Sequence, residues 1–394
     1  MPDGATRIAF LNSGILGHRT VGALFRDVAA LLPRVEPVHV DLSGELSWAD
    51  RAARRIFSLP LAPARGIAGN LDLRRWREEV NVGLLAARRL ARLERERGRF
   101  AVLHFHTQAS AYASLKRMRH TPAIVSIDCT QSLASNEAAS AISRSTYMAN
   151  VLHDAFVFRR ASVITATSRW AADDLLKRYP GGVGKVHVMP YPVSAHFPDS
   201  IVEMRAARLR AEPARPVHVL FIGGDFPRKG GPELLEAWRQ GGFADRAVLQ
   251  VVTEWPLAQR DMPDGVRVVS GVAPHSERWK ELWHEADCFV MPPRHEAFGL
   301  VYQEAAAAGL PVVATRINAI PEIVEHDRTG ILVPPGDAAA LVRAMESVIA
   351  SGELRRRLGK AAQTRIAAAT PAAYAARLHS LIASVLETHG RFAA

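Results

Sequence analysis

Two glutamates, Glu296 and Glu304, stand eight positions apart and are the first candidates for chemistry. Their surroundings predict a buried strand over 288–291, a loop, and a helix over 299–308 that a glycine and a proline then end. Glu296 would lie in the loop and Glu304 about one turn into the helix. Because a carboxylate accepts hydrogen bonds from hydroxyl groups, both positions suit a hydroxyl-rich ligand.

The start of the predicted helix offers complementary chemistry. The backbone N–H groups of Phe298, Gly299 and Leu300 would have no partner within the helix, so they form a site for an anion. Gly299 lets a phosphate approach closely because it has no Cβ. A ligand with phosphate at its middle and hydroxyl-rich groups at both ends, such as a nucleotide sugar, would satisfy the glutamates and the helix start together. Two ordinary solvent-facing carboxylates are the alternative interpretation.

Longer motifs around the glutamates favour the first interpretation. The pair is followed by PVVAT, PEIV, TGILV and PPGD. This run resembles the donor-binding half of the retaining family-4 glycosyltransferases, which have the GT-B fold. The resemblance is dense from 217 to 350 and much thinner in the first half of the chain.

The resemblance implies an α/β protein with two Rossmann-like domains whose parallel sheets face each other across a cleft. Residues 1–195 would form the acceptor-side domain and 196–370 the domain that binds the nucleotide sugar. The last helix, over 371–394, would cross back to the N-terminal domain. Short apolar strands alternate with helical segments along the chain, which independently predicts parallel sheets covered by helices. One of these helical segments is expected over 132–158.

In the family, the two glutamates divide the work of holding the donor. The resemblance implies that Glu304 binds the ribose hydroxyls and that Glu296 binds hydroxyls of the transferred sugar. His295 would shape the sugar pocket or cap the helix, and Glu322 in the PEIV motif would close the pocket. The resemblance implies no metal, no cofactor and no covalent nucleophile.

A second donor segment follows the strand expected over 217–222. Gly223 and Lys229 match the family's diphosphate-binding segment, in which the lysine neutralises the phosphates. The family's arginine, directly after the matching glycine, is replaced by Gly224. Arg228 is therefore the expected source of the second positive charge, and a solvent-exposed lysine turn is the alternative.

The first half of the chain offers fewer candidates. Gly14 and Gly17 follow a predicted first strand, where the family has a glycine loop, although a plain tight turn explains them equally well. His104 and His106 alternate onto one face of a strand, and Asp128 follows the next strand. His106 and Asp128 are thus expected on the acceptor or cleft side, and no third ligand nearby suggests a metal.

Positive charge is concentrated in one region. The chain of 394 residues carries a formal net charge of +11, and 51–99 alone holds thirteen arginines against five acidic residues. The helical pattern there has an apolar and a basic face, which fits a solvated surface helix or a helix on an anionic membrane surface. No zinc knuckle, aromatic RNA-binding motif or basic helix-turn-helix appears, so nucleic acid is not an expected partner.

The expected setting is the cytoplasm. The two cysteines, Cys129 and Cys288, are far apart, no apolar run is long enough to span a bilayer, and the N-terminus lacks a signal-peptide pattern. Peripheral contact with the inner face of the membrane is part of this expectation.

The resulting functional hypothesis is a metal-independent hexosyltransferase. It would move a sugar, with retention of configuration, from a UDP- or GDP-linked donor to a hydroxyl acceptor on a glycan, a lipid-linked molecule or a small molecule. Two alternatives stay open: a nucleotide-sugar 2-epimerase of the same fold and a non-catalytic basic nucleic-acid-binding protein. Dependence of turnover on an added acceptor separates the transferase from the epimerase.

Overall fold

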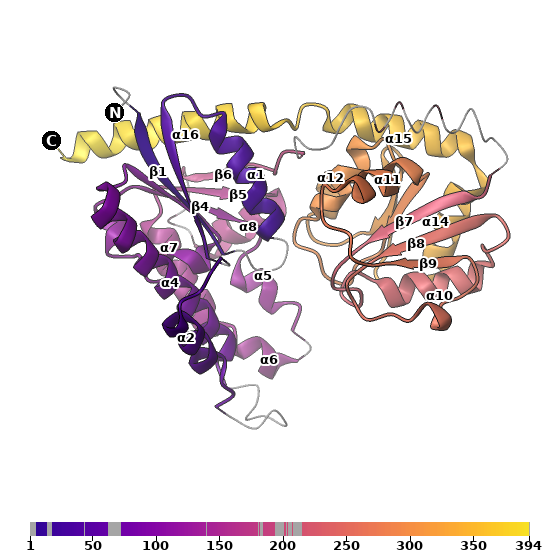
Figure 1. Cartoon of the computed structure of the whole chain (residues 1–394), viewed down its shortest axis with the longest axis horizontal. Helices are drawn as coiled ribbons and strands as arrows, with labels where there is room; N and C mark the ends of the chain where they lie inside the picture. The colour runs from indigo at the N-terminus through magenta and orange to yellow at the C-terminus, as the bar shows by residue number, and fades with distance from the viewer. Residues whose placement is uncertain are drawn as a thin grey trace. The chain divides into compact units, whose positions relative to one another are not determined.

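The chain folds into two compact units, Met1–Pro192 with Pro371–Ala394, and Val193–Thr370. The computed structural model describes 5–13, 18–42, 44–61, 72–138, 140–179, 181, 184–193, 201, 203, 207 and 215–393. In this described part each unit holds one six-stranded sheet whose strands all pair in parallel (Figure 1). The predicted α/β architecture with two parallel sheets is confirmed.

The first unit has the strand order β2-β1-β3-β4-β5-β6. Its strands are β1 (Thr6–Asn12), β2 (Val35–Asp41), β3 (Val102–His106), β4 (Ala123–Ile127), β5 (Val163–Ala166) and β6 (Val186–Val188). Its helices are α1 (His18–Ala30), α2 (Trp48–Ser58), α4 (Arg74–Arg97), α5 (Gln131–Ser135), α6 (Ala141–Ser145), α7 (Met148–Arg160), α8 (Arg169–Arg178) and α16 (Pro371–Ala393), with short 3-10 turns at Gln108–Ala111 and Arg117–Arg119.

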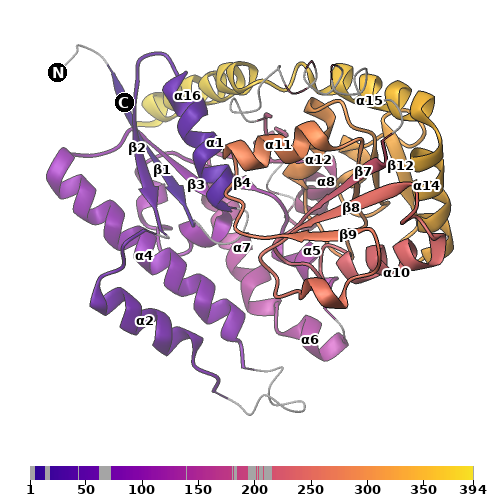
Figure 2. The same ribbon diagram turned by 45° about the vertical axis from the view of Figure 1, so that its right-hand side comes forward.

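Helices cover both faces of this sheet. In both views α1 and α16 lie on one side and α4 on the other (Figures 1 and 2). The ring of Phe25 on α1 contacts both His104 and His106, whereas Phe105 between them joins the core on the other face. The last helix belongs to this unit, and Tyr374 on it packs against the Phe25 ring.

The stretch over 132–158, which was expected to be helical, is divided into several helices. Three helices, α5, α6 and α7, occupy this region. The Thr130 hydroxyl accepts a hydrogen bond from the Leu133 N–H at 3.1 Å, and the Ser140 hydroxyl accepts one from the Ser143 N–H at 3.0 Å. Each of these side chains caps a new helix start, which divides a continuous apolar pattern into separate helices.

The second unit has the strand order β12-β11-β10-β7-β8-β9. Its strands are β7 (Val217–Ile222), β8 (Ala247–Val252), β9 (Val266–Val269), β10 (Cys288–Met291), β11 (Val312–Thr315) and β12 (Gly330–Val333). Its helices are α10 (Gly231–Gly241), α11 (Glu277–Glu285), α12 (Leu300–Ala307), α13 (Ile320–Ile323), α14 (Ala338–Ala350) and α15 (Gly352–Ile366), with a 3-10 turn at Gln259–Asp261. Large aromatic residues fill its core, among them Trp238, Trp283 and Phe289.

The strand order locates the ligand-binding edge of each sheet. The chain starts the second sheet at β7, adds β8 and β9 on one side, and then adds β10 to β12 on the other. The order therefore reverses between β7 and β10, and in open parallel sheets ligands bind beyond the carboxyl ends of the strands at such a point. In the first sheet the same reversal lies between β1 and β3.

Candidate active site

Lys229 and Glu296 meet at the reversal point of the second sheet. Lys229 follows β7 and Glu296 follows β10, and the Lys229 Nζ donates a hydrogen bond to the Glu296 Oε2. The two side chains are only 16% and 11% exposed, respectively. A largely buried ion pair in this position is weakly screened by water, so it interacts strongly with any charged group that approaches.

Arg228 adds a second positive charge beside the same carboxylate. Its Nη1 lies 3.9 Å from the Glu296 Oε2 and donates a hydrogen bond of 2.8 Å to the carbonyl of His295. Its Nε donates to the Asp225 carboxylate at 3.0 Å. The guanidinium group is thus held toward the loop after β10 by three groups from two loops.

Glycine makes the close approach of the two loops feasible. Gly230 has a φ of +79°, and a Cβ at this position would lie 1.8 Å from the carbonyl oxygen of Pro292. A side chain is therefore excluded on steric and conformational grounds. By contrast, a Cβ on Gly224 would meet nothing within 4 Å, so the position where the family has arginine is open.

The start of α12 is fixed by a buried tyrosine. The Tyr302 hydroxyl donates a hydrogen bond of 3.0 Å to the Met291 carbonyl, and a Cβ on Gly299 would lie 2.6 Å from the Tyr302 ring. Gly299 has a φ of +90° and directly precedes Leu300, the first residue of α12, while Phe298 is buried. The predicted loop-to-helix turn is present here, with the helix one residue shorter at each end than expected.

Glu304 lies on α12 in a different environment from Glu296. Its side chain is partly buried, and in the described part of the chain no hydrogen bond or ion pair involves its carboxyl group. Burial raises the pKa of Glu304 to about 7, although the positive charge of Lys229 opposes the shift. Near neutral pH this carboxyl group therefore changes between its protonated and charged forms.

The remaining donor-side candidates surround this pair. His295 takes part through its carbonyl group, which accepts from Arg228, and Gly223 through its carbonyl group, which accepts from the Thr253 hydroxyl at 2.7 Å. Glu322 lies on α13, shortly after Asn318. The Asn318 side chain donates to the Glu296 carbonyl at 3.1 Å, a contact that the sequence did not indicate.

The first unit has its own cluster at the carboxyl ends of its strands. The Tyr191 hydroxyl donates a hydrogen bond to the Asp128 Oδ1 and lies 2.5 Å from the His106 Nε2. The two sequence candidates, His106 and Asp128, are 3.7 Å apart and share this tyrosine. No sequence signal indicated Tyr191, because it stands between Pro190 and Pro192 and far along the chain from His106 and Asp128.

His104 differs from His106 in its surroundings. It is buried in the sheet, where its Nε2 lies 2.8 Å from the Ser126 hydroxyl, and burial lowers its pKa to about 3. It is therefore a neutral interior residue at all ordinary pH values. Gly14 and Gly17 lie outside the described residues. Across the described ranges, no group of three His, Cys, Asp or Glu residues could hold a metal ion.

Known protein families match both units of the chain. The family model "Glycosyl transferases group 1" matches residues 208–365, and "Glycosyltransferase Family 4" matches residues 38–197. Together these matches span most of both units. The chain belongs to the family-4 glycosyltransferases.

Two relatives illustrate how similar this family-4 glycosyltransferase is to other members of known name. It is 28% identical over 324 residues to a D-inositol 3-phosphate glycosyltransferase of Xylanimonas cellulosilytica, and the aligned region covers 78% of this chain and 76% of that relative. It is 27% identical over 326 residues to an alpha-D-kanosaminyltransferase of Streptomyces kanamyceticus, and the aligned region covers 78% of this chain and 82% of that relative.

Solved structures show the same fold. Sucrose-phosphate synthase from Thermosynechococcus elongatus matches with a TM-score of 0.72 at 19% identity, covering 97% of this chain and all of the other. Anabaena HepE in complex with UDP-glucose matches with a TM-score of 0.63 at 16% identity, covering 97% and 99% of the two chains. The predicted GT-B fold is thereby confirmed, and glycosyl transfer is the activity of the family to which the chain belongs.

Proposed function

We propose that this glycosyltransferase moves a hexose-type sugar from a UDP- or GDP-linked donor to a hydroxyl acceptor, with retention of configuration and without a metal ion. The observation that carries the proposal is the Lys229–Glu296 ion pair, flanked by Arg228, at the reversal point of the second sheet. Two cations held at this edge suit a diphosphate. The structural neighbour from Anabaena was solved with UDP-glucose, which is consistent with such a donor.

Each donor-side group has a proposed role. Lys229 and Arg228 neutralise the diphosphate, together with the N–H groups of Phe298, Gly299 and Leu300. Negative charge grows on the leaving phosphate as the glycosidic bond breaks, so positive groups aimed at it stabilise the transition state more than the bound donor. Glu304 binds the ribose hydroxyls in its charged form, and Glu296 binds hydroxyls of the transferred sugar.

A phosphate group must compete with Glu296 for Lys229. The carboxylate is the anionic partner of Lys229, and donor binding requires Lys229 to interact with phosphate. Glu296 would then turn its oxygens to the sugar hydroxyls. Binding of the diphosphate to Lys229 thus releases the Glu296 carboxylate, which then binds the sugar hydroxyls.

The first unit has the proposed acceptor role. His106, Tyr191 and Asp128 form a hydrogen-bonded set at the carboxyl edge of its sheet, where a ligand is expected. We include contact with an anionic membrane surface in the proposal, because the excess positive charge lies in residues 51–99 of this unit. In the described part of the chain, no helix is both long enough and apolar enough to cross a bilayer.

Turnover with defined donors tests the proposed reaction. The purified protein is incubated with UDP- and GDP-linked hexoses, with and without a panel of hydroxyl acceptors, and the products are examined by NMR. The proposal predicts acceptor-dependent release of one nucleoside diphosphate and a product with the anomeric configuration of the donor. Acceptor-independent conversion of the donor would indicate the epimerase, and an inverted product would contradict retention.

A matched pair of variants tests the division of work between the two glutamates. Glu304→Ala should weaken nucleotide binding by roughly tenfold, because it loses an acceptor for two hydroxyl groups. Glu296→Ala should leave binding of the free nucleoside diphosphate equal or tighter, since Lys229 loses a competing carboxylate, while transfer falls by about 100-fold. Isothermal titration and turnover measure both; full transfer activity in Glu296→Ala would contradict the assignment.

A further inference from the structure

Helix α2 exposes large apolar side chains. Trp48 is 77% exposed and Ile56 is 61% exposed, and no residue of this helix is buried. Just beyond its end, Leu59 and Leu61 are 53% and 72% exposed. Large apolar residues scattered over a surface need no explanation, but four of them within fourteen residues form a patch.

The helical geometry places two members of this patch in one band with a basic edge. Trp48 and Ile56 are eight positions apart and therefore lie on the same face of the helix. Arg51 and Arg55 stand three and seven positions after Trp48 and border the band. Phe57, on another face, is half-buried. The helix thus presents an apolar band and arginines to the surroundings.

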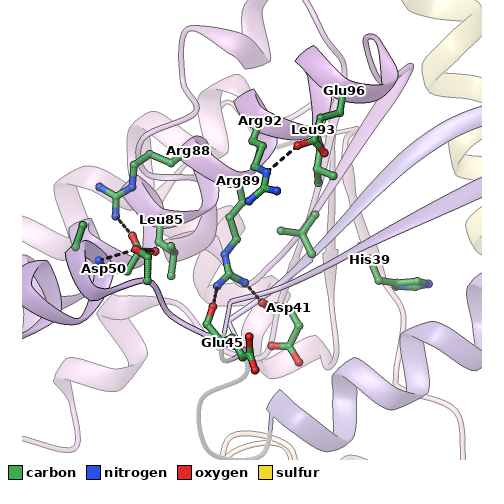
Figure 3. A pocket seen from close by; sticks show the side chains of 13 residues that line it. His39, Asp41, Glu45, Asp50, Leu85, Arg88, Arg89, Arg92, Leu93 and Glu96 are labelled. Atoms are coloured by element: carbon green, nitrogen blue, oxygen red, sulfur yellow. Dashed lines mark hydrogen bonds and ion pairs between the residues drawn. The ribbon is translucent and has the colours of Figure 1, made fainter.

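Three arginines of α4 already form hydrogen bonds or ion pairs within the protein. Arg88 pairs with Asp50 at 2.8 Å, Arg92 pairs with Glu96 at 2.7 Å, and Arg89 donates to the backbone carbonyls of Asp41 and Glu45. These three line an open pocket of about 750 Å³ between the two helices (Figure 3). Carboxylates thus balance the charges of Arg88 and Arg92, whereas carbonyl groups alone hold Arg89.

The basic residues at the exposed end of α2 lack such partners. Arg54 and Arg55 are exposed, and within the described ranges neither forms an ion pair. Arg51 donates to the Leu46 carbonyl, which leaves its positive charge uncompensated. Exposed positive charge without a carboxylate partner among the described residues is thus present on α2, the helix that carries Trp48 and Ile56.

We infer that the α2 surface, composed of Trp48, Arg51, Arg54, Arg55, Ile56, Leu59 and Leu61, binds the surface of an anionic lipid bilayer. The inference deepens the membrane contact in the proposed function, and it assigns that contact to α2. Trp48 suits the headgroup region, where one part of its ring system is apolar and its N–H remains hydrated. Ile56, Leu59 and Leu61 enter the acyl boundary, and the arginines pair with anionic headgroups.

A bilayer fits this surface better than a protein partner. The apolar side chains of α2 share the helix with Arg54 and Arg55, for which the described part of the chain supplies no ion-pair partner. A headgroup layer receives apolar and cationic side chains side by side and supplies the anionic groups that these arginines can pair with.

Cosedimentation with vesicles tests the inference. The full chain is mixed with vesicles of phosphatidylcholine alone and with vesicles containing about a third phosphatidylglycerol, at low and at physiological salt. The protein should bind the anionic vesicles, with affinity that falls as salt rises. Arg54→Gln/Arg55→Gln should lower the partition coefficient about 25-fold, roughly fivefold per charge. Trp48→Ser/Ile56→Ser should lower it by at least about tenfold.

Matched variants on the second unit provide the controls. Arg260→Gln/Arg328→Gln removes the same charge from side chains that are 88% and 77% exposed, and Trp255→Ser removes a tryptophan that is 43% exposed. Both should bind vesicles as the unaltered protein does. Equal loss in the control pair would show a general charge effect and overturn the assignment to α2.

Three other results would also overturn the inference. The first is absence of vesicle binding by the unaltered protein, and the second is full binding by the α2 variants. The third is concentration-dependent self-association in analytical ultracentrifugation that Trp48→Ser abolishes, because the patch would then join two copies. Nucleotide-induced thermal stabilisation, measured in parallel, separates this test from the proposed reaction: its absence in every variant would reject the donor site and leave the vesicle result standing.

Discussion

The two units place different chemistry at equivalent edges of their sheets. In the second unit the ion pair of Lys229 and Glu296 joins the loops after β7 and β10. In the first unit a hydrogen-bonded set of His106, Tyr191 and Asp128 joins the ends of β3 and β4 to the segment after β6. The same edge thus carries a lysine–carboxylate ion pair in one unit and a carboxylate held by a tyrosine hydroxyl in the other. The difference suits a unit that stabilises a leaving phosphate and a unit that orients another group.

Lys229→Ala should have the largest effect on this comparison. Loss of a positive group aimed at developing charge typically lowers kcat by about 10²–10³-fold. Steady-state kinetics with the donor found in the panel measures this loss. Lys280→Ala, which removes a lysine paired with Glu277 on the surface, is the control and should retain full activity. Loss of less than tenfold for Lys229→Ala would place the leaving-group site elsewhere.

The close contact between the loops after β7 and β10 can be disrupted by a substitution that leaves every charged side chain in place. Gly230→Ala puts a Cβ against the Pro292 carbonyl at a positive φ, so we expect a loss of about 3 kcal/mol in the free energy of unfolding. Gly224→Ala meets open space and should change it by less than about 0.5 kcal/mol. Urea unfolding measures both. Equal stability of the two variants would mean that the loops do not need this close contact.

Tyr191→Phe tests whether the first unit orients the acceptor rather than stabilising charge on the leaving group. Removing the hydroxyl leaves Asp128 without one of its donors, so kcat should fall about tenfold while KM for the donor stays the same. Tyr179→Phe is a matched control, because the Tyr179 hydroxyl donates to the Val151 carbonyl at 3.3 Å in the same unit. A change in donor KM for Tyr191→Phe would contradict the separation of roles.

Glu304 supplies the smallest and most specific effect, a pH dependence in donor binding. Its pKa is raised to about 7 by burial, so it is protonated below that value and charged above it. The charged form accepts two hydroxyl donors, hence affinity for a nucleotide sugar should rise about fivefold from pH 6 to pH 8. In Glu304→Gln this rise should disappear. Titration calorimetry at several pH values measures it, and an unchanged pH profile in the variant would remove Glu304 from the ribose site.

The sequence was sufficient for the architecture and for the grouping in the second unit. Lys229 and Glu296 each stand in a short motif directly after a buried strand, and loops after neighbouring parallel strands meet at one sheet edge. Their pairing therefore follows from local patterns plus a general rule of topology. The replacement of the family arginine by Gly224 was also visible, whereas the anchoring of Arg228 by Asp225 and the His295 carbonyl required the structure.

The first unit shows what sequence patterns do not contain. Tyr191 is 63 residues from Asp128 and 85 from His106, so no spacing links them. The helix boundaries near Thr130 and Ser140 depend on capping side chains that an apolar pattern does not reveal. In the basic region, the sequence predicted a helix with apolar and basic faces. Only the structure shows that Arg88 and Arg92 of α4 form ion pairs, whereas Arg54 and Arg55 of α2 form none within the described ranges.

Nucleotide-induced thermal stabilisation tests the central claim most directly. The protein and its Lys229→Ala variant are melted with UDP, GDP and ADP and with their sugar conjugates. A ligand at about 100 times its Kd adds roughly 2.7 kcal/mol to stability, a shift of several degrees. The account predicts that UDP or GDP, with its conjugate, stabilises the unaltered protein and that Lys229→Ala loses most of the shift. No shift with any nucleotide, or an equal shift in the variant, would contradict a diphosphate site built on the Lys229–Glu296 pair.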